Sequence, residues 1–183
     1  MKEISLHILD IVQNSINAGA NLIQIIVAED MELNQLTIII SDNGYGMDQE
    51  TLNLINDPFF TTANKKTGLG IPLFKQHAEA AGGNFVVETE KRKGTTVKAM
   101  LQHDHIDRQP MGDIAATITG QIRAFPDIDF VYRHTFNNKH FTLDTREIKT
   151  ELQEIRINSR EIISFLKDMI NENLIEIRSQ NNC

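Results

Sequence analysis

The sequence predicts an α/β fold in which amphipathic helices alternate with pairs of strands. Apolar residues recur at helical spacing near the N-terminus and again around residue 73. Between and after these stretches, short β-branched segments bounded by turn residues are typical of strands. Because neighbouring segments of this kind pair as hairpins, we expect a mostly antiparallel sheet in the first part of the chain.

The elements of this sheet lie in the first hundred residues. In the first helix Ile4, Ile8 and Ile11 form an apolar stripe that would pack on the sheet. Glycines end the first and third helices, at Gly19 and at Gly82-Gly83. We expect helices at 2–18, 49–55 and 68–81 and strands at 22–28, 36–41, 84–89 and 95–101.

A polar stripe follows the other side of the first helix. Asp10, Asn14 and Asn17 fall at i, i+4 and i+7, so one carboxylate and two amides share a face. Such oxygen ligands suit a hydrated Mg²⁺ whose remaining ligands are phosphate oxygens. The alternative interpretation is an ordinary solvated helix face.

An aspartate marks the exit of the buried strand at 36–41. Asp42 is followed by Gly44 and Gly46, which would let the backbone pass close beneath a flat ligand. The carboxylate could then accept a hydrogen bond from that ligand. The alternative is a plain turn, because Asp-Asn-Gly is also a common turn sequence.

The loop before the third helix has the composition of a phosphate site. Lys65 and Lys66 could neutralise a terminal phosphate, although simple solvation of a loop explains them equally well. Gly68, Leu69 and Gly70 open the helix, and backbone N–H groups at a helix start can cradle phosphate.

These motifs carry a family resemblance. The segments 6–20, 42–46 and 57–70, followed by Gly94-Thr95-Thr96, resemble in this order the N, G1, F and G2 boxes of the gyrase, heat-shock chaperone, histidine kinase and MutL (GHKL) superfamily of ATP-binding domains. The resemblance covers about residues 1–101. It implies a two-layer α/β sandwich, the Bergerat ATP-binding fold, with three helices on one face of a mixed sheet.

The resemblance also implies roles for single residues. Asn14 matches the asparagine that ligates Mg²⁺, and Asp10 stands where many relatives carry a catalytic glutamate. Thr95 would hold the adenine of ATP together with Asp42 and a water. Aspartate in place of glutamate shortens the side chain by one methylene, a departure that bears on how efficiently a water or hydroxyl is activated.

The rest of the chain, 102–183, does not match these boxes. It predicts a connector at 106–113, a helix from Ile114 to Phe125, a hairpin, and two final helices. Asp144 and Asn158 begin candidate capping boxes for the two final helices, and Ile155 would belong to the apolar stripe of the first of them. We therefore expect an ATP-binding domain at 1–101 and a separate small α+β region at 102–183.

Composition restricts the classes of function. The 183 residues carry a net charge of −7, and the basic groups Lys65-Lys66 and Lys91-Arg92-Lys93 are too small for a nucleic-acid-binding face. Neither a signal peptide nor an apolar segment long enough for a bilayer is evident, so we expect a cytoplasmic protein that does not bind membranes. His103 and His105 have no further ligands nearby in sequence, which favours solvated side chains over a metal site.

Two functions remain open from the sequence. The first is a GHKL-type ATPase or kinase-like regulator that binds Mg-ATP and acts on a partner protein. The second is a non-catalytic module whose nucleotide occupancy regulates a partner. The whole-chain pattern is similar to small stand-alone ATP-binding proteins found alongside iron hydrogenase and NADH-dehydrogenase-like subunits, which implies a redox enzyme as the partner. A homodimer is also compatible with the sequence.

Overall fold

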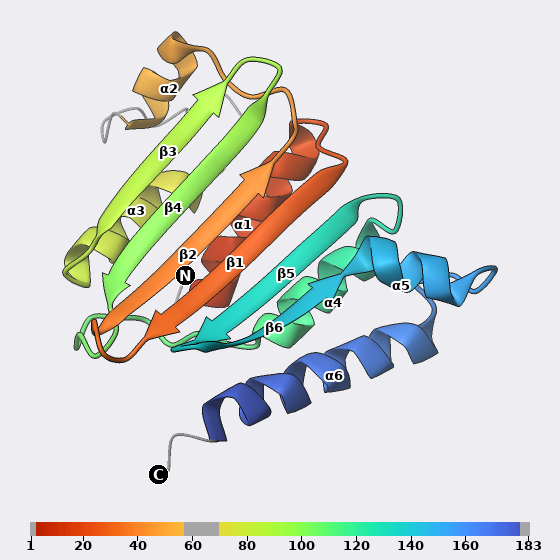
Figure 1. The fold of residues 1–183 in the computed structure, drawn as a ribbon. Coiled ribbons are helices and arrows are strands. Elements are labelled where there is room, and N and C mark those ends of the chain that lie inside the picture. The colour runs from red at the N-terminus through yellow and green to blue at the C-terminus, as the bar shows by residue number, and fades with distance from the viewer. Residues whose placement is uncertain (1–2, 57–69, 180–183) are drawn as a thin grey trace.

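The computed structural model describes residues 3–56 and 70–179 and has an α/β fold built on one six-stranded sheet (Figure 1). The strand order across the sheet is β3-β4-β2-β1-β5-β6. The strands are β1 (Leu22–Asp30), β2 (Gln35–Asp42), β3 (Asn84–Glu90), β4 (Gly94–Gln102), β5 (Asp129–Phe136) and β6 (Lys139–Asp144). The helices are α1 (Ile4–Asn17), α2 (Gln49–Asn56), α3 (Gly70–Ala80), α4 (Ile114–Ala124), α5 (Thr145–Leu152) and α6 (Arg160–Ser179).

The sheet is mixed, as the sequence predicts, and the parallel pairing comes from β5. Among themselves, strands β1 to β4 pair in antiparallel fashion, β1 with β2, β2 with β4, and β3 with β4. Strand β5 then runs parallel to β1, with Leu22 opposite Asp129. Parallel neighbours need a long connection, and here most of the chain lies between them. The hairpin expected at 129–144 therefore extends the sheet of the first hundred residues.

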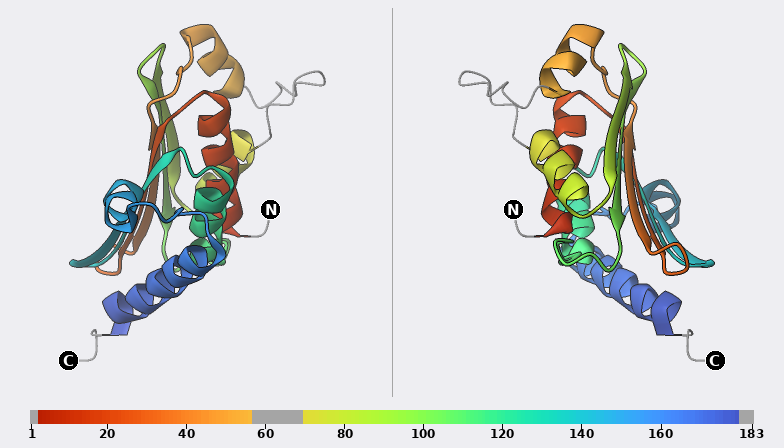
Figure 2. Two further views of the ribbon diagram at one scale, coloured as in Figure 1. Left: turned by 90° about the vertical axis from the view of Figure 1, so that its right-hand side faces the viewer. Right: turned by 90° about the vertical axis from the view of Figure 1, so that its left-hand side faces the viewer.

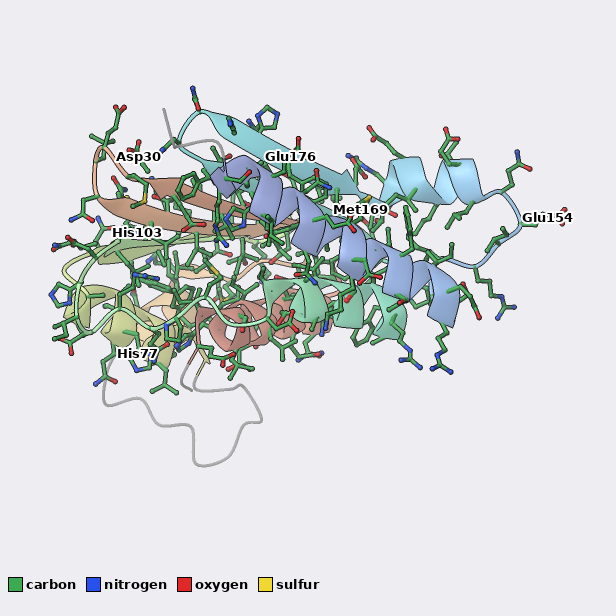
Figure 3. All side chains as sticks on the ribbon, turned by 90° about the horizontal axis from the view of Figure 1, so that it is seen from below. Asp30, His77, His103, Glu154, Met169 and Glu176 are labelled. Carbon is green, nitrogen blue, oxygen red and sulfur yellow. The ribbon has the colours of Figure 1, made fainter. Side chains whose placement is uncertain are left out.

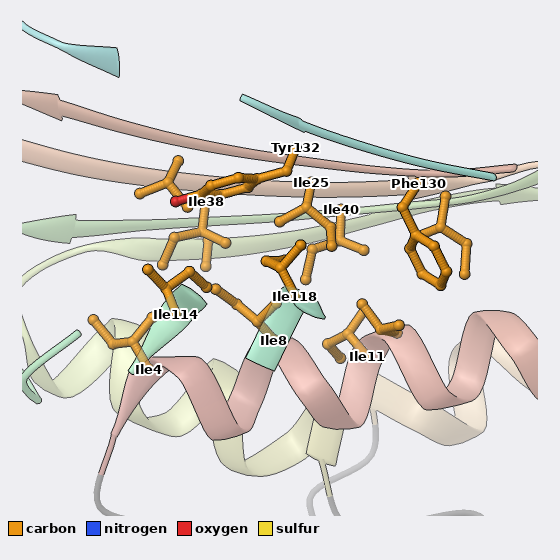
Figure 4. Packing of buried hydrophobic residues seen from close by; sticks show 14 of the residues in the cluster. Ile4, Ile8, Ile11, Ile25, Ile38, Ile40, Ile114, Ile118, Phe130 and Tyr132 are labelled. Atoms are coloured by element: carbon orange, nitrogen blue, oxygen red, sulfur yellow. The ribbon is translucent and has the colours of Figure 1, made fainter. Parts of the chain in front are cut away.

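One layer of helices covers one face of this sheet. Figure 2 shows α1, α3 and α4 on the same side, and α6 continues the layer by packing against α4, β5 and β6. Figure 4 shows Ile8 and Ile11 of α1 facing Ile25 and Ile40 of the sheet, and all four side chains are buried. Burial of each such side chain contributes about 1.5–3 kcal/mol. None of the helices that the structure describes has the length and hydropathy needed to cross a bilayer.

Two details of the final helices differ from the prediction. Helix α5 ends at Leu152 because Gln153 takes a left-handed conformation with φ of 53°, so Ile155 lies in the following loop and is 60% exposed. Helix α6 starts after Ser159, whose hydroxyl accepts a hydrogen bond from the backbone N–H of Ile162 at 3.5 Å. Ser159, and not Asn158, is therefore the N-cap residue.

A buried carboxylate joins the C-terminal elements to β1. The carboxylate of Glu29 lies 2.8 Å from His134 Nε2 and 3.0 Å from His103 Nε2, and it accepts a hydrogen bond from the guanidinium of Arg178. Burial by itself would raise the pKa of Glu29, but these hydrogen bonds outweigh it and hold the pKa well below its usual range. His103, expected to be solvated, is thus part of a buried cluster.

A second polar cluster joins α1, α3 and the connector. The ring of His7 stacks on Phe74 with centroids 4.8 Å apart, and its Nε2 lies 2.8 Å from His77 Nδ1 and 2.9 Å from Gln109 Oε1. A neutral His7 with its proton on Nε2 can donate to either neighbour, and its buried Nδ1 has no hydrogen-bond partner among the described residues. Burial is the main cause that lowers the pKa of His7 to about 4.

Because His7 must be neutral in this packing, the protein should lose stability in weak acid. The unfolded chain takes up a proton near the ordinary histidine pKa of 6.5, whereas folded His7 does so only near 4. The free energy of unfolding should therefore fall as pH decreases from about 6.5 to 4, by at most about 1.4 kcal/mol per pH unit from this group. Urea unfolding of wild type and His7→Gln over this range should give a shallower slope for the variant and parallel curves above about pH 7. Identical slopes in the acid range would contradict the assignment.

Removal of the buried charge of Glu29 should destabilise the protein. In Glu29→Gln the side chain keeps its size, but Arg178 and the two histidines lose a charged acceptor, so the free energy of unfolding at pH 7 should fall by about 1.5–3 kcal/mol. Glu90→Gln provides a matched control, because Glu90 pairs with Lys93 on the surface, where both side chains are at least 65% exposed. Equal losses of unfolding free energy in the two variants would show that the buried cluster contributes no more to stability than a surface ion pair does.

Candidate functional site

Asp42, the last residue of β2, has a carboxylate whose orientation is fixed from two sides. Its Oδ2 accepts a hydrogen bond of 2.6 Å from the hydroxyl of Ser15, and its Oδ1 accepts one of 2.9 Å from the backbone N–H of Gly44. Ser15 is buried on α1, so the helix holds the end of the strand in place. An ionised carboxylate has about four lone-pair sites, and two remain for a ligand.

The glycines that follow Asp42 bring backbone segments together. A Cβ on Gly46, whose φ is +63°, would lie 2.1 Å from the carbonyl oxygen of Glu90. A Cβ on Gly44 would lie 2.8 Å from the carbonyl oxygen of Ala18 at the end of α1. Glycine is required here because the loop touches both the turn between β3 and β4 and the end of α1. The close approach to a flat ligand expected from the sequence stays a prediction.

Hydroxyl groups extend the polar region beside Asp42. Thr95 lies directly opposite Asp42 in the pairing of β2 with β4. Its Oγ1 is 3.0 Å from that of Thr89, which accepts a hydrogen bond from the backbone N–H of Met47 at 2.9 Å. Thr95 is therefore placed next to the carboxylate with which the family resemblance pairs it.

The polar face of α1 is divided in two by the structure. Asp10 and Asn14 are half-buried. Asn17 is exposed, and its Oδ1 accepts a hydrogen bond from Gln13 Nε2 at 3.3 Å. Burial raises the pKa of Asp10 above its ordinary value. The face thus presents one carboxylate with a perturbed pKa and one amide near it.

The first turn of α3 lies against Asp10. A Cβ on Gly70, the first residue of α3, would lie 2.8 Å from Cβ of Asp10, so only glycine fits at this helix start. The N-terminus of a helix favours anions, and a carboxylate beside it would repel a phosphate unless a cation lay between them. This arrangement suits Mg²⁺, a hard cation that takes oxygen ligands and keeps several waters.

Asp10 and Asn14 are the oxygen-bearing side chains that could hold such an ion. No cluster of three or more histidine, cysteine or acidic side chains with metal-binding geometry occurs within residues 3–56 and 70–179. A metal held by one or two protein ligands and by the ligand's phosphates needs no such cluster.

The structure brings together most of the predicted site residues. Asp42, Gly44, Gly46 and Thr95 form one end, and Asp10, Asn14 and Gly70 lie along α1 and the start of α3. Lys65, Lys66, Gly68 and Leu69 lie outside the described residues.

Two further residues of the site, Ser15 and Thr89, were not predicted from the sequence. Ser15 follows Asn14 directly and lies among the apolar residues Ile11, Val12 and Ile16, and a small hydroxyl residue in such a stretch gives no signal of a role in a site. Thr89 lies opposite Thr95 in the pairing of β3 with β4. Its position between the exposed residues Glu88 and Glu90 is the sequence pattern that places Thr89 on the other face of the strand.

The sequence matches a known family of ATPase domains and parts of several curated proteins. Residues 2–105, more than half of the chain, match the model of the family described as histidine kinase-, DNA gyrase B-, and HSP90-like ATPase. Sporulation kinase C of Bacillus subtilis is 30% identical over 93 residues, which are 51% of this chain and 22% of the kinase. The chain thus spans less than a quarter of the length of this relative.

Solved structures extend the similarity of fold beyond residue 105. The N-terminal domain of a DNA repair protein matches with a TM-score of 0.57 and 19% identity, over 97% of this chain and 57% of that chain. The Aquifex aeolicus MutL ATPase domain complexed with ADP matches with a TM-score of 0.52 and 11% identity, over 84% of this chain and 70% of that chain. At these identities the two structures establish the fold alone. The family match over residues 2–105 shows that the chain belongs to the histidine kinase-, DNA gyrase B- and HSP90-like ATPase family of the GHKL superfamily.

Proposed function

We propose that this chain binds Mg-ATP between α1, the start of α3 and the exit of β2, and that it hydrolyses ATP or transfers its γ-phosphate to a partner protein. The observation that carries the proposal is the carboxylate of Asp42, which Ser15 and the Gly44 N–H hold in one orientation beside Thr95. A fixed acceptor with free lone pairs can select a ligand that offers an N–H donor. The exocyclic amine of adenine is such a donor.

The phosphate end of the proposed site lies one to two helical turns away along α1. Asn14 precedes Ser15, and Asp10 lies one turn before Asn14, next to the N-terminus of α3. ATP supplies phosphate oxygens and, with Mg²⁺, the cation that this carboxylate requires. In the proposed roles, Asn14 holds the ion, and Asp10 orients or deprotonates the attacking water or hydroxyl.

The raised pKa of Asp10 supports a role as a base. A general base works best when its pKa is closer to the working pH than that of an ordinary carboxylate, and burial moves Asp10 in that direction. The bound phosphates and Mg²⁺ would alter this pKa in the complex. The alternative is a nucleotide-dependent binding module that regulates a redox enzyme or another partner without turnover, in which Asp10 only borders the ion.

Substitution of Asp42 tests the adenine end of the site. In Asp42→Asn the side chain loses its charge, so affinity for ATP should fall by about 1.5–3 kcal/mol. Wild type should prefer ATP to GTP, because guanine carries no amine at the corresponding position. Calorimetric titration with a non-hydrolysable ATP analogue measures both effects, with circular dichroism to confirm folding. Unchanged affinity in a folded Asp42→Asn protein would contradict the assignment.

A pair of variants separates catalysis from binding at the phosphate end. Asp10→Asn should still bind Mg-ATP but release phosphate about 10²- to 10⁴-fold more slowly, because a general base acts mainly in the transition state. Asn14→Ala should instead lose the magnesium-dependent part of ATP binding. Phosphate release and calorimetric titration, each with and without Mg²⁺, distinguish the two effects. Equal turnover in wild type and Asp10→Asn would favour the binding module.

A further inference from the structure

A groove lies between the outer sides of α1 and α4, away from the residues proposed to bind ATP. It has a volume of about 360 Å³, and Leu6, Leu9, Ala116 and Gly120 contribute its apolar surface. Leu6 is 38% exposed. Gly120 leaves open space, since a Cβ there would meet no atom within 4 Å. The groove can therefore receive an apolar side chain from outside.

The acidic side chains of the groove favour a partner with positive charge. Gln121 is 9% exposed, and its buried Oε1 has no hydrogen-bond partner among the residues that the structure describes. Glu3 and Asp113 add two carboxylates. Asp113 Oδ2 forms an ion pair with Lys167 Nζ at 3.0 Å, and 56% of the Asp113 side chain is exposed. The groove thus suits an apolar side chain flanked by arginine or lysine.

The loop between α5 and α6 carries these groups. Ile155 is 60% exposed, and the exposed residues Arg156 and Arg160 form no ion pair with any residue in 3–56 or 70–179. In Figure 3 this loop, marked by Glu154, projects from the end of the molecule farthest from His77 and the start of α1. Glu154 lowers the net charge of the loop but leaves it two arginines.

We propose that the groove receives the α5–α6 loop of a second copy of this chain. Ile155 would enter between Leu6 and Gly120, and a guanidinium of the loop would donate to the carboxylates of Glu3 and Asp113. About a two-fold axis the loop of each copy enters the groove of the other, so the same contact is made twice and the two copies close into an isologous dimer. The complementary charges set the register of the contact. This inference is independent of the proposed binding of ATP.

Gly120→Leu and Ile155→Ser test the two sides of the contact. Wild type should associate reversibly in sedimentation velocity experiments as its concentration rises. Each variant should weaken association about ten- to a hundredfold, because an apolar side chain is either excluded from the groove or removed from the loop. Gly120→Leu should also melt at a higher temperature, since leucine favours a helix more than glycine does and has space there. A loss of association in that variant would therefore not result from unfolding.

Two matched controls introduce the same residue types, leucine and serine, at exposed positions outside the groove and the loop. Arg123→Leu adds leucine to an exposed position of α4 outside the groove, and Ile175→Ser removes an isoleucine that is 68% exposed on α6. Both controls should associate as wild type does. A wild type that stays monomeric at every concentration overturns the proposal and leaves the groove to another partner. Association that survives both test variants, or that both controls also abolish, overturns it too.

Discussion

The fold depends on how the protein accommodates the buried carboxylate of Glu29. A buried charge is costly unless it is paired, and Glu29 receives its partners from the exit of β4, from β5 and from α6. Arg178 lies 149 residues away in the sequence. The final helix must therefore dock before the charge on β1 is satisfied. This requirement connects the last third of the chain to the strands of the first hundred residues.

Asp42, at the opposite end of the same sheet, has a carboxylate that keeps acceptor sites free. In the antiparallel pairing of β1 with β2, Glu29 lies opposite Leu36 and Asp42 lies opposite Ile23, so the two acids are at opposite ends. Asp42 receives two hydrogen bonds, which fix its orientation but do not use all its acceptor sites. Glu29 stabilises the fold with its full set of partners. Asp42 keeps lone pairs that can accept hydrogen bonds from a ligand.

Helix α1 connects the separate parts of the molecule. Its buried face carries the core isoleucines and Ser15, and Asp10 touches the start of α3. The outer side of the same helix carries Leu6 and Leu9 of the proposed docking groove, and Leu9 directly precedes Asp10. The proposed docking groove and the phosphate end of the proposed ATP site therefore lie on the same helix.

Local sequence patterns were enough to predict the local features of this protein. Helical and two-residue periodicities predicted α1, the strands of the first hundred residues and the hairpin of β5 and β6, because these patterns reflect which face of an element is buried. The order of short motifs around Asn14 and Asp42 predicted the family. Asp48 directly precedes α2, and its carboxylate accepts a hydrogen bond from the backbone N–H of Thr51 at 2.9 Å, as aspartate at a helix N-cap commonly does.

The contacts between elements that are distant in the sequence became evident in the three-dimensional structure. No local pattern shows that β5 pairs in parallel with β1, since pairing between strands about a hundred residues apart depends on the packing of everything between them. The partners of Glu29 and the contact of Ser15 with Asp42 are long-range for the same reason. Ser15 has the small size and burial of a core residue, and only the arrival of β2 beside α1 turns its hydroxyl into the group that aims the carboxylate.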